Sequence, residues 1–311
     1  MSLQNQDHLT RSVRCRSAFG RHAQIVIGVL SLLSGLEPLC SGQGVASAQR
    51  IGEPQDTSRL DVQYILKNTA VTLHEPVILS FIVRNTLPTP ITLTLGIDNV
   101  QFFQFSLTLP GGTTIYSTPP RTEGFFSGTG TVTIQPKESY RQELLLNQWF
   151  RLDATGDYIL TAKLTTRIQG EEVQLLGRTG TLHLTVEPRD AARLQEVCDE
   201  LAKSVVNSPD AKSAYIPAFW LSYVTDPIAV PYLREVLFAQ KLVEPSAIAG
   251  LERIGSTDAA KVLLSALDYQ FGDTAILARG ALGRIQGQIS DPDLRSQISQ
   301  ALSDKRSPNK P

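Results

Sequence analysis

Between about Leu60 and Pro188, apolar and polar residues alternate with a period of two. This is the pattern of a strand with one face in a core and the other in solvent. In EPVILSFIVRN, the apolar positions Val77, Leu79 and Phe81 point one way. Similar runs are ITLTLGI, FFQFSLTL, TVTI, SYRQELLLN, DYILTAKLTT and GTLHLTVEP. Turn residues separate these runs and no helical pattern interrupts them, so we expect about seven or eight strands in an antiparallel β-sandwich.

After Pro188 the apolar period changes to about 3.6, which predicts helices. Asp190 suits the N-cap of a helix that runs to about Val206, and SPDAKS then interrupts the pattern. Three later segments align with one another: WLSYVTDPIAVPYLREVL, GLERIGSTDAAKVLLSAL and ALGRIQGQISDPDLRSQISQAL. Their leading leucines, Leu221, Leu251 and Leu282, recur at about thirty residues, a period typical of stacked helical hairpins.

The three segments resemble short HEAT-like repeats of the PBS-lyase type, in which an Ala/Leu helix ends near Ile-Gly and a second Leu-rich helix returns after a turn that carries Asp. Pro227 and Pro292 suit the first turn of a second helix. Pro231 should kink or delay its helix, and Gln286 to Ser290 is an insertion. Such repeats also occur in enzymes that attach bilins, but that chemistry is cytosolic. An irregular helical bundle is the alternative architecture.

A second resemblance concerns the strand-rich half. Asp153, Gly156 and Tyr158 resemble the tyrosine corner of immunoglobulin-like folds, and Glu75 to Val77 resembles the start of bacterial immunoglobulin-like modules. The disulfide and core Trp of antibody domains have no counterpart. The expected fold is multidomain β + α, with an immunoglobulin-like β-sandwich at 56–188, a short HEAT-like α-solenoid at 190–303 and a disordered tail at 304–311.

The N-terminal segment predicts export. Four arginines, from Arg11 to Arg21, precede the apolar run QIVIGVLSLLSGL, which is too short for a membrane span. Ala46 and Ala48 fit a signal-peptidase site before Gln49. We therefore expect a signal peptide at 1–48 and a bacterial periplasmic or extracellular protein with no membrane span in the mature chain. An uncleaved anchor and a disordered leader are the alternatives.

Charge and cysteine content narrow the classes of function. The formal net charge is −1, so nucleic acid is not an expected partner. If Cys15 and Cys40 leave with the signal, Cys198 remains alone and forms no intramolecular disulfide. Its helical spacing with Leu194 and Leu201 predicts a buried thiol, and no neighbouring base is present to activate it.

Motifs for enzymatic chemistry are lacking in the sequence. It contains no His-Glu-x-x-His, no paired C-x-x-C, no G-x-S-x-G and no calcium loop, so we expect no catalytic, cofactor-binding or metal-ligating residues. Glu171 and Glu172 are expected in a solvated hairpin turn. Our hypothesis is a non-catalytic protein-binding or scaffold module that recognises a protein partner through its helical repeats, with the sandwich as spacer or second contact.

The expected contact residues flank the apolar stripes of the second helices: Tyr232, Arg234, Lys261 and Arg295. Phe125 and Phe126, in the loop GFFSGTG, are a further candidate contact. One alternative is an envelope enzyme regulator, such as a hydrolase inhibitor that acts through this loop, and another is an envelope enzyme of unfamiliar type. A carbohydrate-binding sandwich is weaker, because Trp149 is expected in the core.

Overall fold

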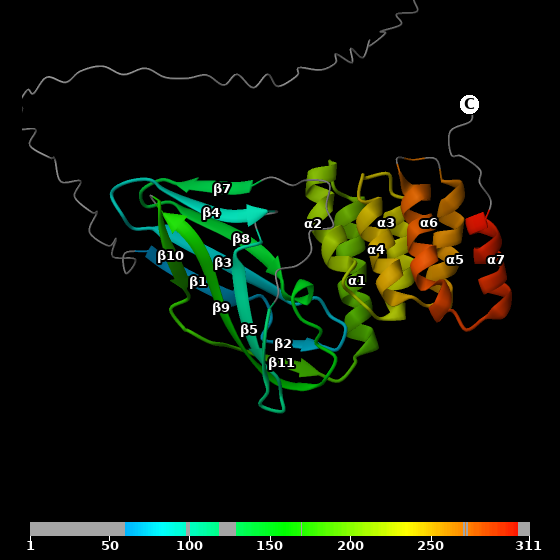
Figure 1. The fold of residues 1–311 in the computed structure, drawn as a ribbon, viewed down its shortest axis with the longest axis horizontal. Helices are drawn as coiled ribbons and strands as arrows, with labels where there is room; N and C mark the ends of the chain where they lie inside the picture. Colours follow the sequence, from blue (N-terminus) through cyan, green and yellow to red (C-terminus); the bar gives the residue numbers. More distant parts are fainter. Residues whose placement is uncertain are drawn as a thin grey trace, which may run out of the picture. The chain divides into compact units, whose positions relative to one another are not determined.

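The computed structural model describes residues 60–97, 100–117, 129–168, 170–269, 271 and 273–303. Strands occupy the first part of these residues, from Leu60 to Glu187, and helices occupy the second part, from Ala191 to Ser303 (Figure 1). We call them the β part and the helical part. The predicted signal peptide (1–48), the predicted tail (304–311), Phe125 and Phe126 lie outside the described residues. No helix within those residues is long and apolar enough to cross a membrane.

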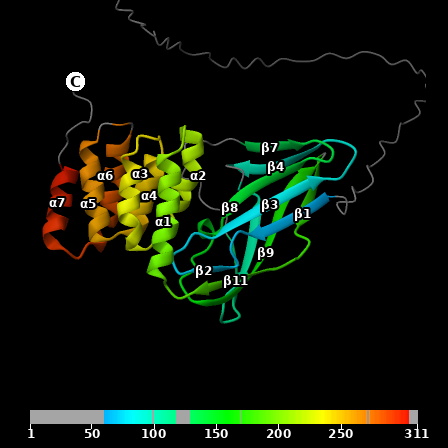
Figure 2. The same cartoon turned by 180° about the vertical axis from the view of Figure 1, so that it is seen from behind.

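The β part contains three sheets (Figure 2). The larger sheet has the order β2-β11-β9-β5-β6, with β10 paired to β9, and the two smaller sheets have the orders β1-β3-β8 and β4-β7. The strand bounds are β1 Leu60–Leu66, β2 Ala70–Thr72, β3 Ile78–Asn85, β4 Ile91–Ile97, β5 Phe103–Thr108, β6 Thr114–Tyr116, β7 Thr129–Ile134, β8 Ser139–Leu145, β9 Gly156–Ile168, β10 Glu171–Leu176 and β11 Leu182–Glu187.

All seven predicted runs form strands, but the described residues contain eleven strands rather than the expected seven or eight, because β1, β2, β6 and β10 were not among the predicted runs. Two further details of the prediction are wrong. The pairing of β2 with β11 is parallel. After β1 the chain leaves the sheet of β1 and β3, and β2 forms the edge of the larger sheet beside β11. Glu171 and Glu172 do not lie in the hairpin turn. They begin β10, opposite Ile168 and Arg167 of β9, and both remain exposed.

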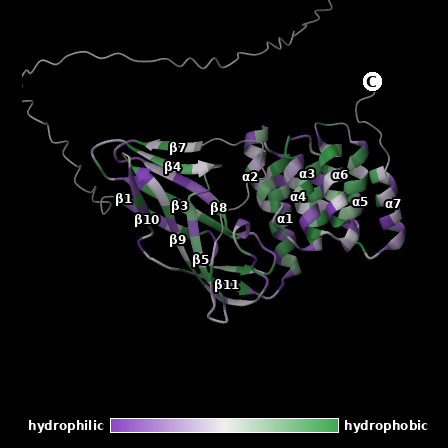
Figure 3. Cartoon of the chain, viewed as in Figure 1, coloured by the Kyte–Doolittle hydropathy of each residue, from purple (hydrophilic) through white to green (hydrophobic). Residues whose placement is uncertain are grey.

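The alternating apolar side chains of all three sheets meet in one hydrophobic core. In Figure 3, hydrophobic and hydrophilic residues both occur along the strands. Aromatic rings run through the core. Phe81 contacts Tyr64 and Phe103 at ring-centroid distances of 5.2 and 5.0 Å, and Phe105 meets Trp149 edge-on at 4.7 Å. Edge-to-face contacts of this kind add to the stabilisation from buried apolar area. The predicted core position of Trp149 is confirmed.

The corner before β9 has the hydrogen bond expected of Tyr158. The Tyr158 hydroxyl donates to the Ala154 carbonyl oxygen, with an O–O distance of 2.6 Å, and the ring is buried. Gly156 has φ of 131°, and a Cβ there would lie 2.8 Å from atoms of the Pro110 ring. Glycine therefore allows the turn and the close approach of the β5–β6 connection.

The helical part consists of seven α-helices among the described residues. Their bounds are α1 Ala191–Val206, α2 Ala211–Leu221, α3 Val230–Leu237, α4 Glu244–Ile254, α5 Thr257–Ser265, α6 Thr274–Ile285 and α7 Pro292–Ser303. Asp190, Asp210 and Ser256 accept hydrogen bonds from the first backbone N–H groups of α1, α2 and α5. These caps satisfy donors that the helices leave unpaired. The predicted start and end of α1 are confirmed.

The helices pack in two layers. One layer is α1, α3, α5 and α7, and the other is α2, α4 and α6. The layers contact each other through the pairs α1–α2, α3–α4, α4–α5, α5–α6 and α6–α7. Leu221, Leu251 and Leu282 are fully buried in the core between the layers. Pro231 lies in the first turn of α3, where its missing N–H costs no helical bond, so it delays the helix rather than kinking it.

Candidate functional site

The four predicted contact residues of the helical part lie in one layer. Tyr232 and Arg234 belong to α3, Lys261 to α5 and Arg295 to α7. The three cations are exposed, and Tyr232 is half-buried against the helical core. The Lys261 ammonium lies 3.2 Å from a carboxylate oxygen of Asp258, one turn earlier. This surface therefore presents long, charged side chains with little exposed apolar area.

A row of aromatic side chains lies on the other layer and was not predicted. Tyr215 stacks on Phe219 with ring centroids 5.9 Å apart, and Phe219 meets Tyr223 edge-on at 5.3 Å. Tyr215 and Phe219 are four apart, so they lie on one face of α2, and Tyr223 follows just after the helix ends at Leu221. Tyr215 is 50% exposed, and the adjacent Ile216 is 49% exposed. The opposite face of α2, formed by Ala214, Ala218 and Leu221, is fully buried.

Arg253 of α4 continues this row. Its guanidinium carbon lies 3.9 Å from the centroid of the Tyr223 ring. Nη1 donates to the Ser222 carbonyl oxygen at 3.0 Å and lies 3.1 Å from the Ser222 hydroxyl. Stacking on an aromatic ring and bonding to a buried carbonyl hold an arginine in one orientation. We call Tyr215, Phe219, Tyr223 and Arg253 the aromatic–Arg surface.

The sequence contained one signal for this surface. From Ala214 to Leu221 every residue is apolar or aromatic, so the helix lacks the polar face that a surface helix normally turns to water. Such a helix is either buried all round or has a second apolar contact. The contribution of Arg253 could not be inferred in this way, because it is thirty residues from Tyr223 in the chain and joins it only through the packing of α4 beside α2.

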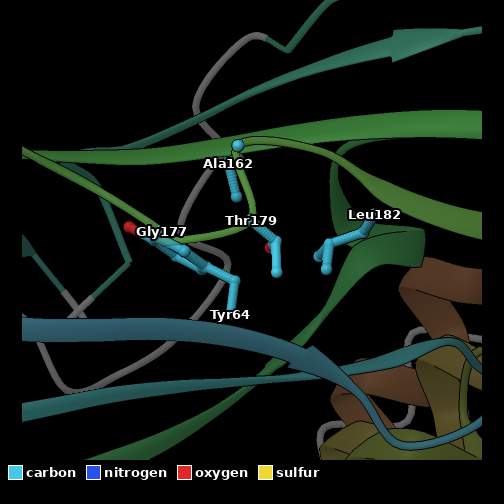
Figure 4. A pocket seen from close by; sticks show the side chains of 6 residues that line it. Tyr64, Ala162, Gly177, Thr179 and Leu182 are labelled. Carbon is cyan, nitrogen blue, oxygen red and sulfur yellow. The ribbon is translucent and has the colours of Figure 1, made fainter.

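Two of the hollows in the described β part are candidate sites. The first, lined by Tyr64, Ala162, Gly177, Thr179, Gly180 and Leu182, has no room for a water molecule (Figure 4). A Cβ on Gly177 would lie 2.8 Å from the Tyr64 ring, and the Tyr64 hydroxyl donates to the Leu175 carbonyl oxygen at 3.1 Å. The second is an open hollow of about 330 Å³ between the β5–β6 turn and the tyrosine corner. We assign the first hollow to packing.

Hydrogen bonds and ion pairs join α1 to the β part. The Arg193 guanidinium donates to the Ala70 carbonyl oxygen at 2.7 Å, and its Nε lies 2.8 Å from a carboxylate oxygen of Glu75. The Glu75 side chain is 3% exposed and also accepts from the backbone N–H of Thr72 at 2.9 Å. Beside this group, Arg189 donates to Asp226 and holds the pKa of that buried carboxyl below its usual value. The buried carboxylates of Glu75 and Asp226 are thus each paired with an arginine and hydrogen-bonded.

Cys198 is buried in α1, as predicted. Burial raises the pKa of its thiol to about 12. We expect Cys198 in the folded chain to resist iodoacetamide at about pH 8, because the thiolate is the reactive form and the sulfur is shielded from solvent. The measurement is mass spectrometry of the Cys198 peptide after labelling with and without guanidinium chloride. Equal labelling in both samples would contradict a buried, protonated thiol.

Glu244, in the first turn of α4, is buried, and its Oε1 has no hydrogen-bond partner among the described residues. Burial raises the pKa of this carboxyl. An acid whose pKa is raised by folding stabilises the fold below its unfolded pKa of about 4.3, and this stabilisation is lost as the pH rises towards the folded pKa. We therefore expect Glu244→Gln to be more stable than the natural chain at neutral pH, by about 1 kcal/mol, and not at acidic pH.

Urea unfolding at neutral and acidic pH tests this expectation. Glu196→Gln, at an exposed position of α1, is the control with the same change of charge. An equal pH dependence in the two variants would contradict the role assigned to the buried Glu244 carboxyl.

Groups of three or more His, Cys, Asp or Glu that could hold a metal ion do not occur within the described part of the chain. No family model and no curated protein matches the sequence. Among solved structures, the structural-genomics target SoR45 matches with 16% identity and a TM-score of 0.27, over 41% of this chain and 85% of that chain. The sporulation control protein Spo0M from Bacillus subtilis matches with 16% identity and a TM-score of 0.26, over 46% of this chain and 55% of its own.

A third match is the alkylpurine DNA glycosylase AlkC from Pseudomonas fluorescens, solved bound to DNA that contains an abasic site analog. Its identity is 12% and its TM-score 0.24, over 42% of this chain and 30% of the glycosylase. This chain thus spans about half of Spo0M and under a third of AlkC. At these identities and TM-scores, no functional argument rests on the three similarities.

Proposed function

We propose that this protein is an exported, non-catalytic protein-binding module, in which the helical part recognises a protein partner and the β part is a spacer or second contact. The observation that carries this proposal is the two-layer packing of the helices. Each layer presents a continuous outer surface built from segments far apart in sequence, as in helical-repeat proteins that bind other proteins.

The proposal includes a fold family for each part of the chain. We take the β part as an immunoglobulin-like sandwich, which the bond from Tyr158 to Ala154 supports. We take the helical part as a short HEAT-like array. This is supported by the equivalent burial of Leu221, Leu251 and Leu282 in α2, α4 and α6, and by Pro292 at the start of α7.

The candidate contacts suit a partner with acidic side chains. Arg234, Lys261 and Arg295 are exposed cations on successive helices of one layer, and Tyr232 adds apolar area beside them. Long cations at the rim of an interface steer association and set specificity more than they set affinity. The proposal therefore attributes recognition to several moderate contacts spread over α3, α5 and α7.

The test is affinity capture from a cell-envelope extract of the source cells. The bait is the full chain, compared with a variant that carries Tyr232→Ala, Arg234→Glu, Lys261→Glu and Arg295→Glu. We expect one protein to bind the natural chain and to be lost from this four-site variant. The control reverses three exposed cations of the β part, Arg84, Lys137 and Arg167. Retention by the four-site variant together with loss from the control would contradict the proposal, as would a natural chain that retains nothing.

A further inference from the structure

The inference concerns the aromatic–Arg surface of α2 and α4 and rests on the proposed function. We propose that this surface binds an acidic segment of a protein partner, in which an Asp or Glu side chain is adjacent to an apolar or aromatic one. The carboxylate would pair with Arg253, and the adjacent side chain would contact Tyr215 and Ile216.

The apolar contacts of this surface are provided by α2. One face of the helix is buried in the helical core. Tyr215 and Ile216, away from that face, remain exposed although they are aromatic and aliphatic. Tyr, Phe and Arg are enriched at the centres of protein interfaces, where rigid aromatic rings provide contact area at a low cost in side-chain entropy. The α3–α5–α7 surface has arginines and one half-buried tyrosine, Tyr232, but its candidate residues form no row of contacting rings, so the two surfaces differ in the contacts they can make.

The positive charge of this surface is provided by Arg253. Within the described residues, no carboxylate oxygen lies within 4.0 Å of its guanidinium. In contrast, Arg284 of the adjacent helix α6 is held by Glu252, with Nη2 and Oε2 2.7 Å apart. Both hydrogen bonds from Arg253 to Ser222 use Nη1, so Nε and Nη2 can donate to a ligand with planar acceptor oxygens. A carboxylate has that geometry and the complementary charge.

The size and charge of the surface favour a protein segment over a polyanion. Nucleic acids and highly sulfated chains are bound through many cations in a row. Here one exposed arginine is adjacent to a neutral Glu252–Arg284 pair and a row of rings. The arrangement fits a single acidic side chain with apolar residues beside it.

The experiment uses a phage-displayed library of random dodecapeptides selected on the full chain. We expect the enriched peptides to share an Asp or Glu next to an aromatic or aliphatic residue. The dissociation constant of an enriched peptide should rise about tenfold or more in Arg253→Gln and in Tyr215→Ser. Thermal unfolding of both variants checks that they fold, and Arg234→Gln on the other layer is the control with the same loss of charge.

A double-mutant cycle makes the test specific. Replacing the peptide's Asp by Asn, or its Glu by Gln, should weaken binding to the natural chain about tenfold and have little effect on binding to Arg253→Gln, because the pair is already broken. Independent, additive losses would overturn the inference, as would a library with no enriched peptide. If an enriched peptide is lost only from the four-site variant, the inference is wrong and the proposed function stands. If neither helical surface matters, both are wrong.

Discussion

Replacement of Arg193 by alanine is expected to lower the free energy of unfolding by roughly 3–5 kcal/mol. The Glu75 carboxylate is almost completely buried, and Arg193 is the cation that pairs with it. Removing the guanidinium leaves a buried negative charge whose remaining donor, among the described residues, is the uncharged Thr72 N–H. It also unpairs the Ala70 carbonyl oxygen. The cost arises mainly from the charge left without a partner.

Chemical denaturation of the full chain measures this effect. Arg178→Ala is the matched control, because Arg178 pairs with Asp61 at 3.0 Å while its own side chain is 72% exposed. The Asp61 side chain is 18% exposed, and a pair whose cation lies mainly in solvent contributes about 1 kcal/mol or less. Addition of Glu75→Gln to Arg193→Ala should recover part of the lost stability, since it removes the unpaired charge. Equal effects of Arg193→Ala and Arg178→Ala would show that the ion pair of Glu75 is not buried in solution.

Gly250→Ala is the second substitution with a large expected effect. A Cβ at this position of α4 would lie 2.9 Å from the Cα of Ser222 and 2.9 Å from Cδ2 of Leu233. The Ser222 contact is with backbone, which cannot move without shifting its segment. Alanine normally favours a helix over glycine by about 1 kcal/mol. Here overpacking reverses that sign, and we expect a net destabilisation of about 1–3 kcal/mol.

Gly283→Ala is the matched control for Gly250→Ala. Gly283 lies in α6 with no atom within 4 Å of its Cβ position. Gly283→Ala should therefore stabilise the chain by up to about 1 kcal/mol through helix propensity alone. Urea unfolding of the two variants should give shifts of opposite sign. Stabilisation by both substitutions would mean that α4 does not approach the Ser222 backbone as closely as described.

Periodicity predicted most elements of the fold, because long strands and helices repeat one burial pattern many times. The prediction missed β1, β2, β6 and β10. Of these, β2 and β6 have three residues each and are too short for alternation. The parallel pairing of β2 with β11 joins Val71 to Val186 and depends on a change of sheet that no local pattern encodes.

The candidate site was predicted less completely than the fold. Exposed cations such as Arg234 are recognisable because they flank an apolar stripe at helical spacing. Tyr215 and Phe219 were missed because aromatic residues at that spacing usually indicate a core, and only the tertiary packing shows which face of α2 is already occupied. The Glu75–Arg193 pair, 118 residues apart in sequence, is likewise a product of the fold.

The central claim, that the helical part recognises a protein partner, is tested most directly by site-specific photo-crosslinking in the source cells. A benzophenone amino acid would be placed at Tyr215, at Arg234 or at Tyr116, which is 79% exposed at the end of β6. We expect the same protein to be crosslinked from position 215 or 234, or from both, and not from position 116. A protein crosslinked only from position 116 would place recognition on the β part and contradict the account.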